Sequence, residues 1–398
     1  MTRASCLLLL ASLTPLVSRA AAADRRVEIR TREELRAAAA AARPGDTLAL
    51  AAGSYGALFA AHWQGRPGQP IRLCALDPQA PPVLEGGLHL SACAHVELRD
   101  LVVRGAPHNG INIDDGGDLA TPAHHVKLVN LLVEDVGGRA NADGIKLSGV
   151  FDVAVESCTV RRWGRGGSAL DLVGCHRATI ERCTFEDDPR EPAASGVQAK
   201  GGSSEVAIRR CRFVHAGQRA VNAGGSTGKP YFRPALTGKD DAEARRITIE
   251  DCSFVGSQAP LAFVGVDGAI VRHNTLYAPQ RWVLRILQES SGPEFLPCRN
   301  VQLSRNLVAY RRSELRSFAN IGPGTASETC ALDATYWFAL DAPQAPPPAE
   351  LGVRQTHVAG GADPLFRDAE QGDFRLREGS PARGYGVREE RDQPKSGK

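Results

Sequence analysis

The chain has 398 residues, 42% of them hydrophobic and 23% charged, a balance typical of a folded globular protein that excludes a disordered one. Its formal net charge of +3 is too small to indicate a nucleic-acid partner. Beyond the N-terminus no stretch is long and apolar enough to cross a bilayer, so no membrane partner is expected.

The first residues have the pattern of a secretory signal. Arg3 gives a positive start, "CLLLLASLTPLV" is a short apolar stretch, and "SRAAAAD" offers a cleavage site before Asp24. The alternative is a short membrane anchor, but an apolar run of about a dozen residues is too short to span a bilayer. We therefore predict a signal peptide over residues 1–23 and a secreted or periplasmic protein.

An Ala-rich helix is predicted next, in "TREELRAAAAAARPGD". Thr31 and Glu34 have the spacing of a capping box, in which each side chain satisfies a free backbone N–H at the start of a helix. We expect this helix to cover the open N-terminal edge of the strands that follow, within an N-terminal cap of residues 24–52.

A short apolar phrase then recurs along the chain, as in "VAVESCTV", "ATIERCTF", "VAIRRCRF" and "ITIEDCSF". Its equivalent positions are Leu101, Leu131, Cys158, Cys183, Cys211, Cys252, Asn274 and Asn306. They are spaced 22 to 41 residues apart, which is typical of a solenoid. The units are β-strands broken by Gly, Asn and Asp, with no room for crossover helices. We predict an all-β fold, a single-domain right-handed parallel β-helix over residues 24–388.

In such a fold the repeated position becomes one inward column. A metal or redox site is one interpretation of its cysteines. A stack of small buried side chains is the other, and no CxxC spacing supports zinc. The sequence does not decide whether Cys298 and Cys330 form a disulfide. From about Ser313 the repeat loosens, which predicts an irregular C-terminal cap over residues 313–388 and a polar tail over residues 389–398.

A second phrase, as in "DGIKLS", "SALDLV" and "SGVQAK", also occurs once per coil. Because side chains alternate along a strand, the residue after each buried position faces outward. This predicts an outward column of Asn112, Lys146, Asp171, Gln198, Asn222, Phe263 and Arg285. A second column holds Asp114, Ser148 and Lys200, and a third holds Asn109, Asp143, Ser168, Ser195 and Arg219. The polar face is interpreted as a binding surface, with a stabilising ion-pair and amide ladder as the alternative.

Two long excursions leave the same side of the predicted solenoid, after Asn112 and after Asn222. Loops of this length usually shape a binding surface. The first excursion carries Asp114, Asp115, Asp118, His124 and His125, and the second carries Lys229, Tyr231, Phe232 and Arg233. With the polar face as a floor they predict a groove for an extended polymer. The aromatic residues are expected to stack on sugars and the cations to hold acidic groups. The predicted substrate-binding residues are Asn112, Asp143, Lys146, Asp171, Gln198, Asn222, Lys229, Tyr231, Phe232, Arg233 and Arg285.

Four functions fit such a groove. Hydrolysis needs two carboxylates with one kept protonated, whereas the acidic residues here lie near lysines. β-Elimination at a uronate needs a base, a cation for the carboxylate and an acid, and Lys200 with Arg219 on adjacent coils suits it. An epimerase shares the first step, and a non-catalytic glycan-binding protein needs only the groove.

The chain resembles the pectin-lyase-like β-helix superfamily, most of all the chondroitinase B and alginate lyase family. "LRAAAAAARPGDTLALAAGSYG" and "PIRLCALDPQAPPVLEGG" look like that family's first turns, and "DPLFRDAEQGDFRLREGSPARGYG" is similar to a closing segment of secreted β-helix proteins. The resemblance implies a polysaccharide lyase acting on an acidic polysaccharide, expected as a monomer. It implies Lys200 as base and Arg219 as acid, although the family's arginine position falls near Asn222 or Ala223. Ala193 and Ser195 stand where calcium-dependent members carry acidic residues, so neither calcium nor another cofactor is expected.

Overall fold

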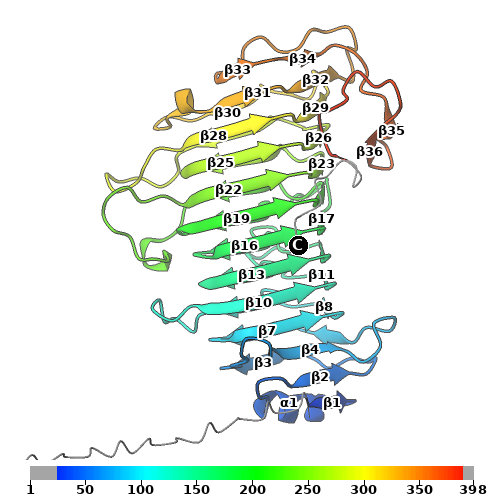
Figure 1. Cartoon of the computed structure of the whole chain (residues 1–398), viewed down its shortest axis with the longest axis vertical. Coiled ribbons are helices and arrows are strands. Elements are labelled where there is room, and N and C mark those ends of the chain that lie inside the picture. The colour runs from blue at the N-terminus through cyan, green and yellow to red at the C-terminus, as the bar shows by residue number, and fades with distance from the viewer. Residues whose placement is uncertain (1–24, 389–398) are drawn as a thin grey trace, which may run out of the picture.

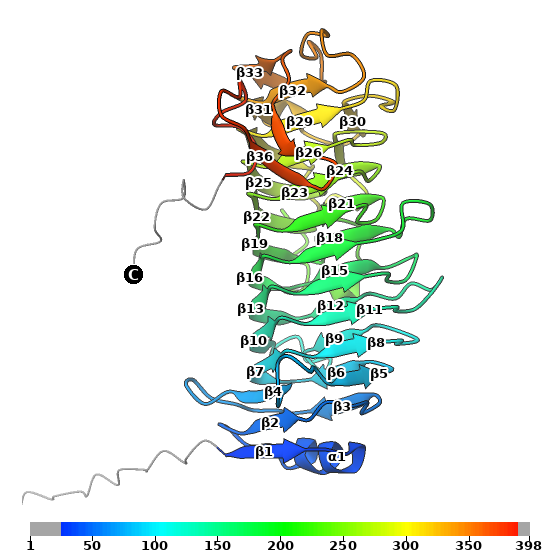
Figure 2. The same ribbon diagram turned by 90° about the vertical axis from the view of Figure 1, so that its right-hand side faces the viewer.

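The computed structural model describes residues 25–388, which form a tall stack of coils with three strands in most turns (Figure 1). The proposed signal peptide and polar tail lie outside the described residues. The strands form parallel sheets of 13, 11 and 10 members, named A, B and C here. Each strand pairs with the equivalent strand one coil away, as Figure 2 shows for the stacked strands of sheet C.

Sheet A contains β1 (Arg26–Ile29), β2 (Thr47–Leu50), β4 (Ile71–Ala75), β7 (Ala94–Arg99), β10 (Ala123–Val129), β13 (Val150–Glu156), β16 (His176–Glu181), β19 (Ser203–Arg209), β22 (Ala244–Glu250), β25 (Val266–Arg272), β28 (Arg299–Ser304), β31 (Ala331–Asp333) and β33 (Arg354–Thr356). Sheet B contains β5 (Val83–Glu85), β8 (Val102–Arg104), β11 (Leu132–Glu134), β14 (Thr159–Arg161), β17 (Thr184–Glu186), β20 (Arg212–Val214), β23 (Ser253–Val255), β26 (Thr275–Tyr277), β29 (Leu307–Tyr310), β32 (Tyr336–Ala339) and β34 (Ala359–Gly360). Sheet C contains β3 (Leu58–Ala61), β6 (Leu88–Ser91), β9 (Ile111–Asp114), β12 (Ile145–Ser148), β15 (Ser168–Val173), β18 (Ser195–Lys200), β21 (Arg219–Gly224), β24 (Ala259–Val264), β27 (Leu284–Leu287) and β30 (Ala319–Ile321).

The remaining elements lie near the two ends of the stack or in loops. Helix α1 (Arg32–Ala40) lies beside β1 and β2 and has the predicted capping box between Thr31 and Glu34. Two short 3-10 helices, η1 (Lys229–Tyr231) and η2 (Ser327–Thr329), lie in loops. The antiparallel pair β35 (Phe366–Asp368) and β36 (Asp373–Leu376) follows the last coil. Among residues 25–388, no helix has both the length and the apolar character needed to cross a membrane.

The repeated apolar position forms the inward column that the sequence predicts. Cys158, Cys183, Cys211 and Cys252 precede paired strands of sheet B, and each is at most 1% exposed. Their thiols donate to backbone carbonyls, and the nine cysteines of the described chain, Cys298 and Cys330 among them, are free. The column therefore consists of small buried side chains, which the coil-to-coil spacing packs without cross-links.

The two long excursions leave the stack on the same side, before β10 and before β22, on the left of Figure 1. Further short loops on this side connect the other strands of sheet C to sheet A. The outer face of sheet C therefore lies beside a wall formed by residues 225–243.

Candidate functional site

Polar side chains run in register along the outer face of sheet C. The strand pairing aligns His89, Asn112, Lys146, Asp171, Gln198, Asn222, Ala262 and Arg285 on successive coils. The register agrees with the sequence prediction from β9 to β21 because Ile111, Ile145 and Val197 are buried on the opposite face. We call this column, with the neighbouring residues that it contacts, the sheet C stripe.

The sequence prediction is wrong for Phe263. The register pairs Asn222 with Ala262, and Phe263 lies in the core with no exposed surface. The prediction of Arg285 in the column is confirmed, because Arg285 pairs with Ala262.

A buried carboxylate lies between two lysines at the centre of the stripe. Asp171 is 2% exposed, and its Oδ2 lies 2.6 Å from Lys146 Nζ. Its Oδ1 lies 3.5 Å from Lys200 Nζ. Lys146 also donates to Asp143 Oδ2 at 3.1 Å. The structure thus brings together four predicted site residues from three consecutive coils.

Burial and mutual interaction set the charge of this centre. Burial, with repulsion from Asp171, raises the pKa of Asp143 above its usual range. Burial opposes the charge of Lys146, but attraction by Asp171 and Asp143 outweighs it and raises the pKa of Lys146. Lys146 therefore stays protonated at neutral pH and acts as a cation.

Lys200 lies at the end of β18 and Arg219 at the start of β21, and both side chains contact residues of the column. Lys200 Nζ donates to Gln198 Oε1 at 3.2 Å, and Arg219 Nη1 donates to Asn222 Oδ1 at 3.3 Å. Gln198 and Asn222 are paired neighbours on adjacent strands. Arg219 itself pairs with Ser195 and lies at the strand entry, as the sequence predicts. Its guanidinium also bonds Glu289 at 2.9 Å, a contact that the repeat pattern does not reveal.

The stripe continues toward the N-terminus as a chain of hydrogen bonds. Asn109 Nδ2 donates to Asn112, and Asn112 Nδ2 donates to Asp114 at 2.7 Å. Asp114 also contacts His89 Nε2 and accepts from Ser91 Oγ, both at 2.6 Å. Burial opposes the ionised form, yet these bonds hold the pKa of Asp114 below its usual range. His89 is thereby oriented by a carboxylate, and sequence reasoning missed it although "GLHLS" has the alternating pattern.

A pocket of about 560 Å³ opens beside His89, and its lining includes Arg32, Arg36, Phe59 and His108. Phe59 is 66% exposed and meets the His89 ring edge-on at 5.0 Å. An exposed aromatic ring with two nearby arginines suits a sugar that carries an acidic group. These residues belong to the cap and first coils, where the repeat is too irregular to align.

Arg285 extends the stripe at the other end. Its guanidinium lies 4.6 Å from the Trp282 ring centre and donates to Asn320 at 2.9 Å. Burial, with repulsion from Arg219, lowers the pKa of Arg285 from its usual value.

The long loop over residues 225–243 corrects two of the predicted binding residues. Phe232 is 2% exposed and packs against Phe295, so its ring is closed to a sugar. Arg233 is 9% exposed and forms a two-pronged ion pair with Asp115. The loop folds back across several coils, and these two side chains hold it against the solenoid.

Two glycines make this fold-back possible. Gly174 and Gly202 have φ of +60° and +88°, and a Cβ on Gly174 would lie 2.5 Å from Arg233 Cβ. A Cβ on Gly202 would lie 2.7 Å from Arg233 O. Glu243, which is fully buried, fastens the other end of the loop by accepting from Gly201 and Thr227.

Two other predicted loop residues stay on the surface. Tyr231 is 63% exposed. Lys229 has a side chain that is 64% exposed, with its Nζ 2.6 Å from Glu294. Ala193 and Ser195, which stand where calcium-dependent members of the resembled family carry acidic residues, are fully buried and 3% exposed, respectively.

Comparison with known proteins identifies the architecture. Residues 86–233 match the family model described as the right handed beta helix region, which covers less than half of the chain. The chain is a right-handed parallel β-helix. This confirms the fold that the sequence resemblance implies. No curated protein matches the sequence.

Solved structures with the same fold include polysaccharide lyases. An alginate lyase from Paenibacillus sp. str. FPU-7 is 16% identical, with a TM-score of 0.51, and the match covers 77% of this chain and 99% of that one. A rhamnogalacturonan lyase is 14% identical, with a TM-score of 0.54 over 87% of this chain and 92% of that one. The PL6 family polysaccharide lyase Pedsa3628 from Pseudopedobacter saltans is 12% identical, with a TM-score of 0.50 over 91% and 99%. At these identities the likeness shows the fold of the β-helix alone.

Proposed function

We propose that this β-helix is an exported polysaccharide lyase that cleaves a uronate-containing polysaccharide by β-elimination in a groove along the sheet C stripe. The observation that carries the proposal is the centre around Asp171, which Lys146 and Lys200 contact from the coils on either side of it. The lyase activity of the similar structures supports it. Export rests on the N-terminal sequence pattern.

The two lysines have different roles in this proposal. Lys146 contacts two carboxylates and keeps its proton, so it cannot act as a base. Lys200 has one carboxylate contact, which is longer at 3.5 Å, and its side chain is partly exposed like that of Lys146. Lys200 is therefore the residue that reaches substrate as the base.

The reaction needs a proton acceptor and a proton donor on the same groove. Lys200 Nζ takes the proton from C5 of the uronate, and the electron pair of that C–H bond forms the C4=C5 double bond as the C4–O4 bond breaks. Arg219 supplies the proton to the leaving oxygen and regains it from solvent. Partly exposed donors along the stripe, such as Gln198, hold the sugar hydroxyls and the carboxylate.

The deciding experiment measures ultraviolet absorbance of unsaturated uronate on a panel of acidic polysaccharides. We expect activity on at least one polymer and its loss in Lys200→Ala, with retained polymer binding. Lys127→Ala is the matched control, because Lys127 is paired with Glu156 on the outer face of sheet A. No unsaturated product on any polymer would contradict the proposal.

A glycan-binding protein without catalysis is the second candidate. It is favoured by one observation: Lys146, Lys200 and Arg219 each contact an acidic side chain, so these three cations are all held in ion pairs. A binder would retain the polymer in wild type and in Lys200→Ala alike, and neither would make product.

The same assay separates the two other activities. An epimerase would invert C5 without cleaving the chain, which proton magnetic resonance of the polymer detects. A hydrolase would release reducing ends with no ultraviolet signal.

A further inference from the structure

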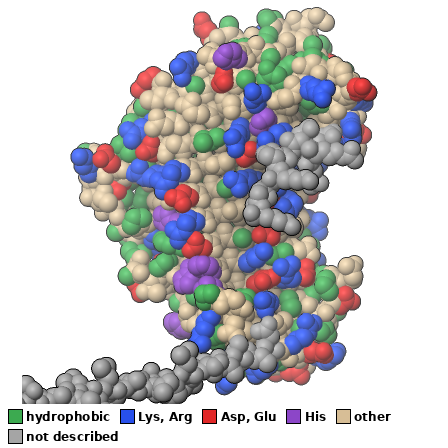
Figure 3. Space-filling model, in the orientation of Figure 1, with side chains coloured by type: hydrophobic (Ala, Val, Ile, Leu, Met, Phe, Trp, Pro, Cys, Tyr) green, Lys and Arg blue, Asp and Glu red, His purple; other side chains and the backbone are tan. Residues whose placement is uncertain are grey.

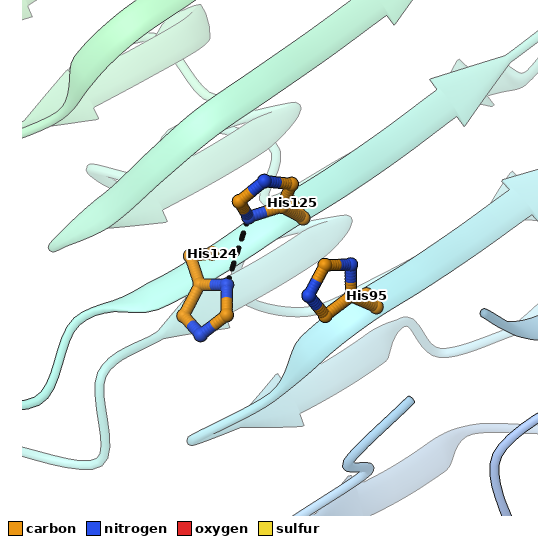
Figure 4. A group of neighbouring side chains, drawn as sticks. All are labelled: His95, His124 and His125. Carbon is orange, nitrogen blue, oxygen red and sulfur yellow. Dashed lines mark hydrogen bonds between the residues drawn. The ribbon is translucent and has the colours of Figure 1, made fainter. Parts of the chain in front are cut away.

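Three histidines gather on the outer face of sheet A, away from the sheet C stripe. Figure 3 shows a group of histidine side chains on the lower part of this face, and Figure 4 shows His95, His124 and His125 turned toward one another. His95 lies on β7, and the other two lie on β10, its neighbour in the sheet. One ring nitrogen from each lies within 4.8 Å of the others.

The backbone explains how consecutive residues share one face. Successive side chains of a strand normally point to opposite faces. His125 has a φ of +55°, in the left-handed region, so its side chain turns outward beside that of His124 while Val126 is buried. His95 has a φ of +49° and does the same one coil earlier. The same left-handed position recurs at Asp152 and Arg177 on the next coils, so it belongs to the repeat, and on β7 and β10 histidines occupy it.

The rings are held close together without a carboxylate among them. His124 Nδ1 and His125 Nδ1 are 2.9 Å apart, and the rings of His95 and His125 stack with 4.3 Å between centroids. Burial and the neighbouring histidines lower the pKa values of His95 and His124, which favours neutral imidazole. Neutral imidazole is the form that binds metal.

We propose that His95, His124 and His125 bind one Zn²⁺ ion on the outer face of sheet A. Three imidazoles are a common zinc ligand set and leave one coordination position open. Zinc–nitrogen bonds of about 2.0–2.1 Å require ligand nitrogens roughly 3.3 Å apart, close to the 2.9 Å separation of His124 and His125. Small rotations of the partly exposed rings complete the approach.

A second residue layer supports the same site. Asp152 Oδ2 lies 3.9 Å from His125 Nδ1, and Arg177 holds this carboxylate through two hydrogen bonds of 2.6 and 2.8 Å. A carboxylate this close to the cluster adds negative charge beside the site, which favours a bound cation. Because the ligands come from β7 and β10, bound zinc would join two coils and stabilise that end of the stack.

The test is titration of the untagged, chelator-treated, dialysed full chain with Zn²⁺ by calorimetry. We expect one ion per chain and a rise in melting temperature. Co²⁺, used as a coloured substitute, should give visible absorption of a low-symmetry site. His124→Ala should weaken Zn²⁺ binding at least tenfold. His357→Ala is the matched control, because His357 is an exposed histidine paired with Asp333 on another coil, and it should change nothing.

A second variant protects the test from misfolding. His125→Asn keeps a residue that tolerates positive φ, so the strand should keep its shape, as circular dichroism will show. It should also lose at least tenfold in affinity. The proposal would be overturned if the wild type bound no Zn²⁺. It would also be overturned if His124→Ala and His125→Asn bound Zn²⁺ as tightly as the wild type does. Polymer cleavage is not a readout here, so the result is independent of the lyase proposal.

Discussion

Lys146 and Asp171 form an ion pair between adjacent coils, with 2.6 Å between Nζ and Oδ2, and the carboxylate is 2% exposed. A charge buried this deeply is stabilised by its partners and not by water. The same carboxylate also contacts Lys200, the proposed base, so Asp171 both stabilises the stack and contacts the proposed catalytic residue.

Asp171→Asn should therefore lower the free energy of unfolding by about 3 kcal/mol, since it leaves the partly buried Lys146 with Asp143 as its one carboxylate. Urea denaturation followed by circular dichroism measures the change. Glu205→Gln is the control, because it breaks an exposed ion pair with Arg246 and should cost less than about 1 kcal/mol. Equal effects of the two substitutions would show that Asp171 is not an important partner of the lysines.

Arg233→Ala tests whether the long loop is fastened or binds substrate. The change leaves the carboxylate of Asp115, which is 2% exposed, without its cation, so we expect a loss of about 3 kcal/mol in stability. Thermolysin should then cut the loop over residues 225–243 faster than in the wild type.

Arg190→Ala serves as control for that experiment, because Arg190 is 86% exposed and pairs with Asp188 on the surface. If Arg233→Ala weakened polymer binding while stability and proteolysis stayed unchanged, the earlier interpretation of Arg233 as a substrate ligand would stand.

Much of this architecture follows from the sequence, because alternation fixes the register of a strand wherever apolar and polar residues take turns. In "SGVQAK" the buried Val197 leaves one choice for Gln198 and Lys200, and the structure agrees. In "PLAFVG" four apolar residues follow one another, so the pattern does not distinguish two registers that differ by one residue. The prediction puts Phe263 on the outer face, whereas Ala262 occupies that position.

Other parts of the site have no signal in the repeat. Arg233 meets Asp115 because a loop folds back over the coils, a contact between residues 118 positions apart. The three histidines converge because His95 and His125 adopt positive φ, which breaks the alternation on which the prediction depends. Both features are tertiary and depend on the folded backbone.

Acid should remove part of the stability that Glu134 provides. Glu134 is 2% exposed and contacts Arg104, Arg161 and Arg162. Burial opposes its charge, but the hydrogen bonds from Arg161 and Arg104 hold the pKa of Glu134 below its ordinary value. A lowered carboxyl pKa contributes stability that is present above the pKa of the unfolded chain and is lost as pH falls through that of the folded protein.

Glu134→Gln should therefore be less stable than the wild type by about 2 kcal/mol at pH 7. The difference should shrink as pH falls below about 4.3, the ordinary glutamate pKa. Urea denaturation at a series of pH values measures it. If the stability difference between wild type and Glu134→Gln grew as pH fell, the folded protein would not lower the pKa of Glu134, and the prediction would be wrong.

Phe59 and Tyr231 are the exposed aromatic residues beside the stripe and on its wall, 66% and 63% exposed. If they stack on sugar rings, Phe59→Ala and Tyr231→Ala should each weaken binding of an acidic oligosaccharide about three- to tenfold, since one aromatic contact contributes about 0.5–1.5 kcal/mol. Neither should change the melting temperature much, because little surface is buried at either ring. Ile270→Ala is the control, since Ile270 is 52% exposed on the outer face of sheet A. Calorimetry on a catalytically inactive Lys200→Ala background measures binding without turnover, and unchanged affinity in both aromatic variants would place the sugar elsewhere on the β-helix.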